Sequence, residues 1–480
     1  MSSRGLHGLM RISVVLLLLS FLPGRPLFSQ DKADTASAQA TATGKTWKNR
    51  PERIRVEDKN NGPPFSFIFH RDTSSGLTVL RVFIAGGKKA EPPDRKGLAF
   101  LTTRLSVEIP VSTDVIKLMT LGSSIATDVD GDYSMITVTC LSENLEETIK
   151  ILIGVLKDPL FSSLRISYIK KAMEHQQKNE EDNTGLSMER EYFNIFFGNS
   201  GYGGSIFGTA AAAGVQDSLK AINKKDIVTF YKTFFNRAHM VIVVSSDLSK
   251  AAVEPVIKKY SRLLPAGQET PAPAQGDGDG TGAGEVKSEN NEKKECFFKK
   301  ENTQALVSLG ALLPGMGPHH FVCASMLENL LGEGIGSKIW PLRAELNLAY
   351  SLKAKVIQMK DAGILWVYLK TDNSRKEKAS GALKKVLADL YQNGVSEEEF
   401  YAAKIRTRAH FLRSNETKET RTFYLGLFEQ IGPGFEFLED FFSAIDTVTP
   451  GDFNAYIQEV LKPDRLAKIV IGPGHQEGNR

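Results

Sequence analysis

The sequence is poor in residues that form cross-links or bind metals, since its 480 residues include three cysteines and eight histidines. An odd number of cysteines argues against a disulfide framework. Cys140 and Cys323 stand in apolar segments, which predicts small core residues. The net charge of +4, from 60 basic and 56 acidic residues, predicts no nucleic-acid partner, because such a partner needs a concentrated basic face. The length favours two or more domains.

Long apolar runs are also absent, with one exception near the start. "ISVVLLLLSFL" follows Arg4 and Arg11; this run is shorter than the ~20 residues that cross a bilayer but typical of a signal-peptide core. We therefore predict a signal peptide over residues 1–29 and a disordered polar leader over 30–50. We expect the mature chain to be exported, to the periplasm if the source is bacterial, without a membrane span. An uncleaved anchor is the alternative.

A second polar stretch divides the rest of the chain. Residues 265–295 are rich in Pro, Gly and charge and nearly free of large apolar side chains. Such a stretch cannot bury enough surface to offset the entropy lost on ordering. We predict a flexible linker there, which separates an N-terminal module over residues 51–264 from a C-terminal module over residues 296–476.

The two modules carry matching patterns. "KKDIVTFYKTFFNRAHMVIVV" near the end of the first parallels "PGDFNAYIQEVLKPDRLAKIVIG" near the end of the second. In each, an Asp (Asp226 or Asp452) precedes apolar residues four and eight positions later, which predicts an N-capped amphipathic helix before a strand. Internal duplication predicts an α+β fold of two homologous modules. Each module would be a mostly antiparallel sheet with helices packed on one side.

Motifs of common enzymes are missing: there is no GxSxG elbow, no P-loop, and no pair of histidines at the spacing of a zinc hydrolase. One segment, Leu327 to Val356, is predicted to form a helix, a glycine-rich turn, a short helix and a strand. Its polar members include Arg343 and Tyr350. Arg can grip a carboxylate or carbonyl oxygen, and Tyr can donate a hydrogen bond to a developing oxyanion. A surface ion pair and a strand-filling ring are the alternative interpretation.

"GLTVLRVFIAGG", "EPPDRKGLA" and "LGEGIGSKIWPLRAELNLAYSL" resemble segments of the insulinase-like zinc peptidases (the pitrilysin clan, M16), over roughly residues 54–475. Active members of that family carry His-x-x-Glu-His directly after the Gly-Leu-Ala. Here Phe100 and Arg104 stand at the two histidine positions, and Thr103 stands at the position of the general-base glutamate. The third ligand, a glutamate, would fall between Glu174 and Glu181.

The resemblance implies that this chain binds no metal. Phe offers no lone pair, and Arg is a permanent cation that repels zinc. A lone carboxylate on a later helix cannot hold the ion, and the sequence offers no compensating site. The chain is therefore expected to be unable to hydrolyse peptides alone.

Some members of the family work as pairs of unlike chains, in which the chain without the zinc motif presents an Arg and a Tyr to a shared chamber. Arg343 and Tyr350 match that pair in type and in their spacing of seven. The resemblance implies a homologous zinc-bearing partner and an unfolded peptide substrate. Arg343 would anchor the peptide and Tyr350 would bond the scissile carbonyl or its oxyanion. Gly332, Gly334 and Gly336 would line the chamber, because glycine permits close backbone approach.

Two other functions remain open at this point. One is a non-enzymatic scaffold on the same fold, and the other is a stand-alone peptide-binding protein.

Overall fold

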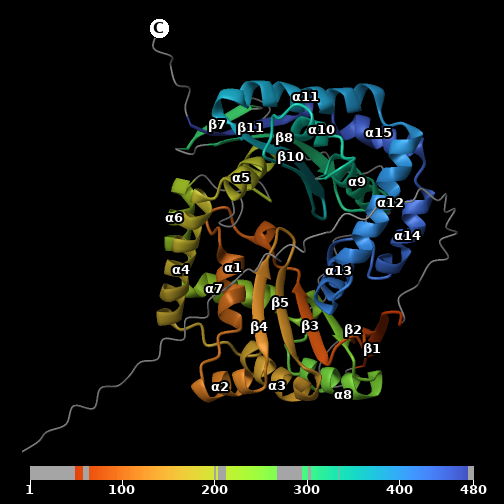
Figure 1. Cartoon of the computed structure of the whole chain (residues 1–480). Coiled ribbons are helices and arrows are strands. Elements are labelled where there is room, and N and C mark those ends of the chain that lie inside the picture. Colours follow the sequence, from red (N-terminus) through yellow and green to blue (C-terminus); the bar gives the residue numbers. More distant parts are fainter. Residues whose placement is uncertain are drawn as a thin grey trace, which may run out of the picture. The chain divides into compact units, whose positions relative to one another are not determined.

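The computed structural model describes residues 49–57, 64–198, 202–203, 212–267, 295–300, 304–332 and 334–473. The predicted signal peptide and nearly all of the predicted leader and linker lie outside these residues. The described segments from Asn49 onward belong to one compact unit. In it two sheets, each accompanied by helices, account for the architecture (Figure 1).

The first sheet has six strands in the order β1-β2-β6-β3-β5-β4. Neighbouring strands are antiparallel except for the parallel pair β2 and β6. The strands are β1 (Glu52–Val56), β2 (Phe65–Arg71), β3 (Leu77–Ile84), β4 (Ser124–Val129), β5 (Ser134–Leu141) and β6 (Met240–Ser246). The helices that follow them in this half are α1 (Leu98–Ser106), α2 (Ser112–Thr120), α3 (Leu145–Leu156), α4 (Ser163–Asp182), α5 (Thr184–Phe197), α6 (Ala212–Ala221), α7 (Lys224–Phe234) and α8 (Lys250–Ser261).

The second sheet has five strands in the order β7-β11-β8-β10-β9. They are β7 (Glu295–Lys299), β8 (Gln304–Pro314), β9 (Ser351–Gln358), β10 (Ala362–Asp372) and β11 (Ala467–Gly472). Its helices are α9 (Pro318–Leu331), α10 (Trp340–Ala344), α11 (Lys376–Asn393), α12 (Glu397–Ser414), α13 (Lys418–Ile431), α14 (Phe437–Thr447) and α15 (Pro450–Val460). Apart from β1, the two sheets share one strand order and one parallel pair, β2–β6 or β7–β11. The predicted two-module α+β fold is confirmed.

The matching helices α7 and α15 show how the repeated pattern works. Each begins with a capping box, in which Asn223 or Thr449 accepts a hydrogen bond from the backbone N–H of Asp226 or Asp452. The Asp side chain accepts one in return from the cap residue. The predicted helices are confirmed, but each Asp occupies the third helical position rather than the cap itself.

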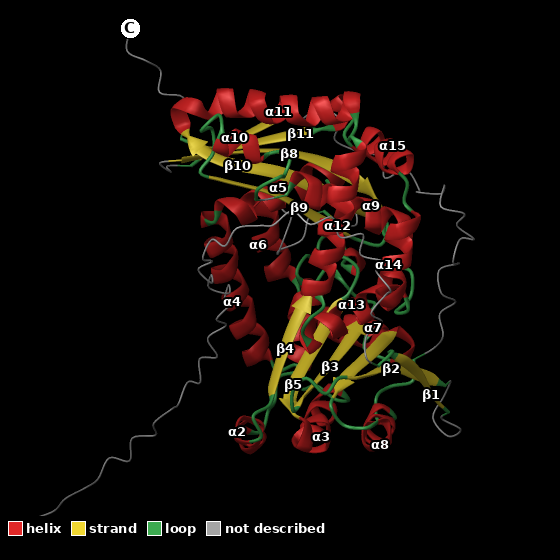
Figure 2. Cartoon of the chain, turned by 45° about the vertical axis from the view of Figure 1, so that its right-hand side comes forward, coloured by secondary structure: helices red, strands yellow, loops and turns green. Residues whose placement is uncertain are grey.

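The two halves exchange one helix each, which the sequence did not indicate. Helix α13 of the second half packs on β3 and β6 of the first sheet, and α5 of the first half packs on β8 and β11 of the second (Figure 2). The Tyr192 hydroxyl on α5 donates to Ser308 on β8 at 2.7 Å. Both faces of each sheet are therefore covered, one by helices of its own half and the other by a borrowed helix.

Close approach at these two contacts depends on glycine. A Cβ placed on Gly426 of α13 would lie 2.0 Å from the ring of Phe83 on β3. In the other contact, a Cβ on Gly310 of β8 would lie 2.3 Å from the ring of Tyr192. Each borrowed helix thus meets its sheet at a glycine facing an aromatic ring. Cys140 and Cys323 are both fully buried, so their predicted place in the core is confirmed.

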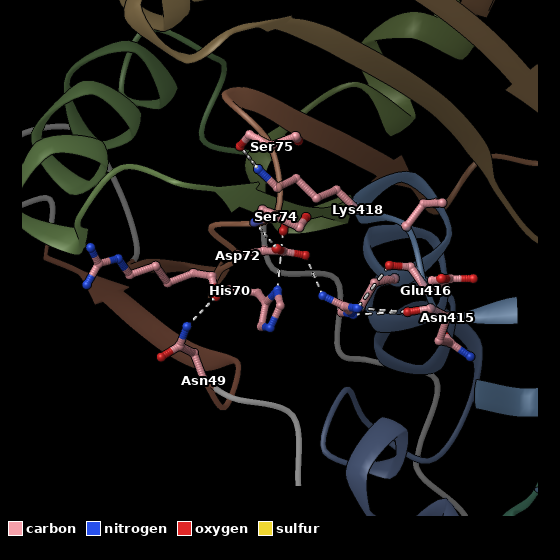
Figure 3. A network of polar contacts seen from close by, with 12 residues as sticks. Asn49, His70, Asp72, Ser74, Ser75, Asn415, Glu416 and Lys418 are labelled. Atoms are coloured by element: carbon pink, nitrogen blue, oxygen red, sulfur yellow. Dashed lines mark hydrogen bonds and ion pairs between the residues drawn. The ribbon is translucent and has the colours of Figure 1, made fainter. Parts of the chain in front are cut away.

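A buried polar network fastens α13 to the end of β2 (Figure 3). Arg421 pairs with Asp72 at 2.5 Å, and both side chains are 9% exposed. Lys418 donates to the carbonyl oxygens of Ser75 and Leu77, at 2.7 Å each. His70, beside this ion pair, is 2% exposed and contacts Ser245.

Candidate functional site

The first candidate region is helix α1, which begins after Gly97 in a left-handed conformation, φ +94°. Its first N–H groups are satisfied by a side chain from the preceding loop. Glu91, fully buried, accepts hydrogen bonds from the N–H of Gly97 at 3.1 Å and of Ala99 at 2.9 Å. A carboxylate suits the positive end of a helix, although burial raises the pKa of Glu91 to about 7. Glu91 therefore holds the start of the helix in place.

The three residues at the zinc-motif positions take part in ordinary helix packing. Phe100 is half-buried against the core of the first half. The hydroxyl of buried Thr103 donates to the carbonyl of Ala99 at 2.7 Å. Arg104 pairs with Glu108 at 3.3 Å, one turn further along the chain. Phe100 and Arg104, at the two histidine positions, offer no lone pair for zinc, and Thr103 has no carboxylate to serve as a base.

Helix α4, which would carry the third ligand, packs beside α1. Glu174 lies on it, half-buried, and His175 is exposed. Among the described residues, no three side chains of His, Cys, Asp or Glu come close enough to hold a metal ion. The residues present at this place therefore do not fit the family's zinc site, although α1 and α4 are both in position.

The second candidate region is the glycine-rich turn between α9 and α10. Gly334 and Gly336 both adopt positive φ, +107° and +84°, which side-chain-bearing residues rarely do. A Cβ on Gly332 would lie 2.9 Å from the carbonyl oxygen of Glu328. The Arg406 guanidinium fixes the turn by donating to the Gly336 carbonyl at 2.8 Å. Between the two positive-φ glycines Ile335 is 87% exposed, so the turn presents an apolar side chain to solvent.

The turn leads into the segment with the predicted peptide contacts. Arg343 lies on α10, exposed, with its guanidinium over the ring of Trp340 at 5.5 Å. Tyr350, 54% exposed, directly precedes β9. Its hydroxyl lies 2.9 Å from both carboxylate oxygens of Asp372, the last residue of β10. This hydrogen bond is the main cause that raises the pKa of Tyr350.

The structure groups the sequence candidates into two sets on different halves. Phe100, Thr103 and Arg104 share α1, whereas the glycine turn, Arg343 and Tyr350 form one continuous stretch of the second half. Sequence reasoning missed Glu91 and Asp372. Glu91 stands in the quoted loop "EPPDRKGLA", where an acid before a helix start could have suggested a cap. Asp372 is the last residue of strand β10, and the pairing of β9 with β10 brings it close to Tyr350.

Comparison with known proteins identifies the fold and the family. The profile "Insulinase (Peptidase family M16)" matches residues 67–210, and the profile "Peptidase M16 inactive domain" matches residues 221–407. The chain belongs to the M16 family of insulinase-like peptidases, and it carries Phe100, Thr103 and Arg104 at the positions compared above with that family's zinc motif.

Curated relatives resemble the chain in sequence, and a solved structure shares its fold. The non-peptidase homolog YmxG of Helicobacter pylori is 24% identical over 75% of this chain and 82% of its own length. An uncharacterized zinc protease of Mycobacterium leprae is 24% identical, and the match spans 54% of this chain and 57% of that protein. A structure described as a peptidase M16 inactive domain from Pseudomonas fluorescens superposes with a TM-score of 0.73 at 19% identity, covering 88% of this chain and 98% of that one.

Proposed function

We propose that this chain is the exported, metal-free subunit of a heterodimeric M16 peptidase. A homologous partner would supply the zinc ion and the general base, and the two chains together would cleave unfolded peptides. The observation that carries the proposal is helix α1. It is retained beside α4, yet it holds Phe100, Thr103 and Arg104, which contribute packing, a helix hydrogen bond and an ion pair.

Residues of the second half support the proposal that this chain helps to bind the peptide substrate. Arg343 is exposed, and none of the described residues forms an ion pair with it, so its guanidinium is available to a peptide carboxylate or carbonyl. Tyr350 stands half-exposed at β9, an edge strand of its sheet. An extended peptide can add to such an edge through main-chain hydrogen bonds. The turn at Gly332, Gly334 and Gly336 would approach the peptide backbone closely.

Export to the periplasm is the proposed location, resting on the apolar run near the start of the chain. Among the described residues no helix is long and apolar enough to cross a membrane.

The experiment pairs the purified chain with a zinc-bearing relative from the same genome and measures peptide cleavage. Arg343→Ala should lower kcat/KM of the pair by about 100-fold, by analogy with removal of one group that stabilises the transition state. Tyr350→Phe should lower it by up to about tenfold, the effect of losing one hydrogen bond to the peptide. Arg465→Ala, at an exposed arginine near β11, is the matched control and should change nothing. Unchanged activity in both site variants would favour a scaffold instead.

A further inference from the structure

The hydrogen bond between Tyr350 and Asp372 has a defined direction. An ionised carboxylate has only acceptor atoms, so the proton in this contact belongs to the tyrosine hydroxyl. The hydroxyl lies 2.9 Å from each carboxylate oxygen and shares its single proton between them. Tyr350 therefore has no second proton to donate to another group while Asp372 is in place. The lone pairs of its hydroxyl oxygen can still accept a hydrogen bond, and Tyr350 is 54% exposed.

Asp372 is itself held in position. Arg375, in the short turn Asn373–Arg375 after β10, lies 3.8 Å from the Asp372 carboxylate. The same guanidinium donates at 2.9 Å to the carbonyl of Asn347, which adopts the left-handed conformation with φ +50°. The backbone N–H of Tyr350 donates to Lys370 on β10 at 2.9 Å. The end of β10 thus fastens the stretch between α10 and β9 at three points.

We infer that Tyr350 acts toward a bound peptide as a hydrogen-bond acceptor for a backbone N–H, and that Asp372 is the positioning residue that sets this role. A phenol that donates to a carboxylate becomes a better acceptor, because hydrogen bonds in series polarise one another. Arg343 has donors only. The stretch then offers a donor and an acceptor, which are the complements of the C=O and N–H of an extended peptide.

This inference rests on the proposed function and changes the expected part of Tyr350 in it. A hydroxyl that donated to the scissile carbonyl would stabilise the oxyanion. A hydroxyl that accepts from an N–H instead fixes the register and direction of the peptide. The recognised group is then a secondary amide nitrogen of an extended peptide at one position along the chain.

The first test examines the Asp372 contact in the free chain. Tyrosines labelled with 13C are titrated by NMR, and the Tyr350 signal is assigned by its loss in Tyr350→Phe. Asp372→Asn should move the Tyr350 titration midpoint down toward the ordinary value near 10. Asp389→Asn, at an exposed acid on α11, should leave it unmoved. If Tyr350 titrates alike in the wild type and Asp372→Asn, the inference is wrong, whether or not the chain serves a peptidase.

The second test uses the pair with a fluorogenic peptide and analogues that carry a methyl group on one amide nitrogen each. With the wild-type pair, one methylated analogue should be cleaved with a kcat/KM about tenfold or more below that of the unmethylated peptide. With Tyr350→Phe, the same methyl group should cause no further loss, because both changes remove the same hydrogen bond. Losses that multiply at every position would overturn the acceptor role. A wild-type pair that neither binds nor cleaves peptides rejects the proposed function. The NMR titration still decides whether Tyr350 donates its hydrogen bond to Asp372.

Discussion

At the scale of single residues, α1 shows how side chains other than metal ligands pack at the positions of the family's zinc motif. The backbone keeps its place because Glu91 caps the helix and because the three motif positions pack or bond locally. Residue types alone lead to the prediction that α1 binds no zinc, since no arrangement gives Phe100 or Arg104 a lone pair for the ion. They could not predict the Glu91 cap, which depends on how the preceding loop folds back.

The same scale explains a pH dependence centred on His70. Burial, with the nearby charge of Arg421, lowers the pKa of His70 to about 4, against about 6.5 for an exposed histidine. As the pH falls from about 6.5 to about 4, the unfolded chain gains a proton that the folded chain does not. Folding stability should therefore fall by up to about 3 kcal/mol across this window through His70 alone.

His70→Gln removes this contribution. Urea unfolding at a series of pH values should show a smaller loss of stability between pH 6.5 and pH 4 in the variant than in the wild type. His175→Gln, at an exposed histidine on α4, is the control and should keep the wild-type slope. Equal slopes in His70→Gln and the wild type would contradict the buried, neutral state of His70.

At the scale of helices and strands, the sequence showed the duplication but not the exchange of α5 and α13. The strands β3 and β10 carry apolar residues at consecutive positions, such as Val82 and Phe83, so both faces need cover. A repeated pattern says which elements correspond. It does not say whether a helix covers its own sheet or that of the other half, because both arrangements bury the same amphipathic face.

The exchanged contact at α13 gives a stability prediction. Gly426→Ala would ordinarily stabilise a helix, but here its Cβ meets the Phe83 ring, so unfolding should become easier by about 1–3 kcal/mol. Gly381→Ala on α11, where a Cβ meets open space, should gain about 0.5–1 kcal/mol. Denaturant midpoints of the two variants measure the contrast. A stabilising Gly426→Ala would place α13 away from β3.

At the scale of the whole described unit, the two modules depend on each other. Residues 51–264 without α13 would expose one face of the first sheet, and residues 296–476 without α5 would expose one face of the second. Expressed separately, neither segment should show a cooperative melting transition by circular dichroism, and mixing them should restore one. A sharp transition in either segment alone would mean that the exchanged helices are dispensable.

The central claim is that α1 is a vacated zinc site and that this chain needs a partner to take part in peptide cleavage. The most direct measurement is the zinc content of the purified chain after incubation with zinc and removal of the excess, determined by native mass spectrometry. We predict that the chain alone carries no zinc and that its complex with the zinc-bearing partner carries about one ion, on the partner, as expected for a three-ligand catalytic site. About one zinc ion bound to the chain alone would contradict the account.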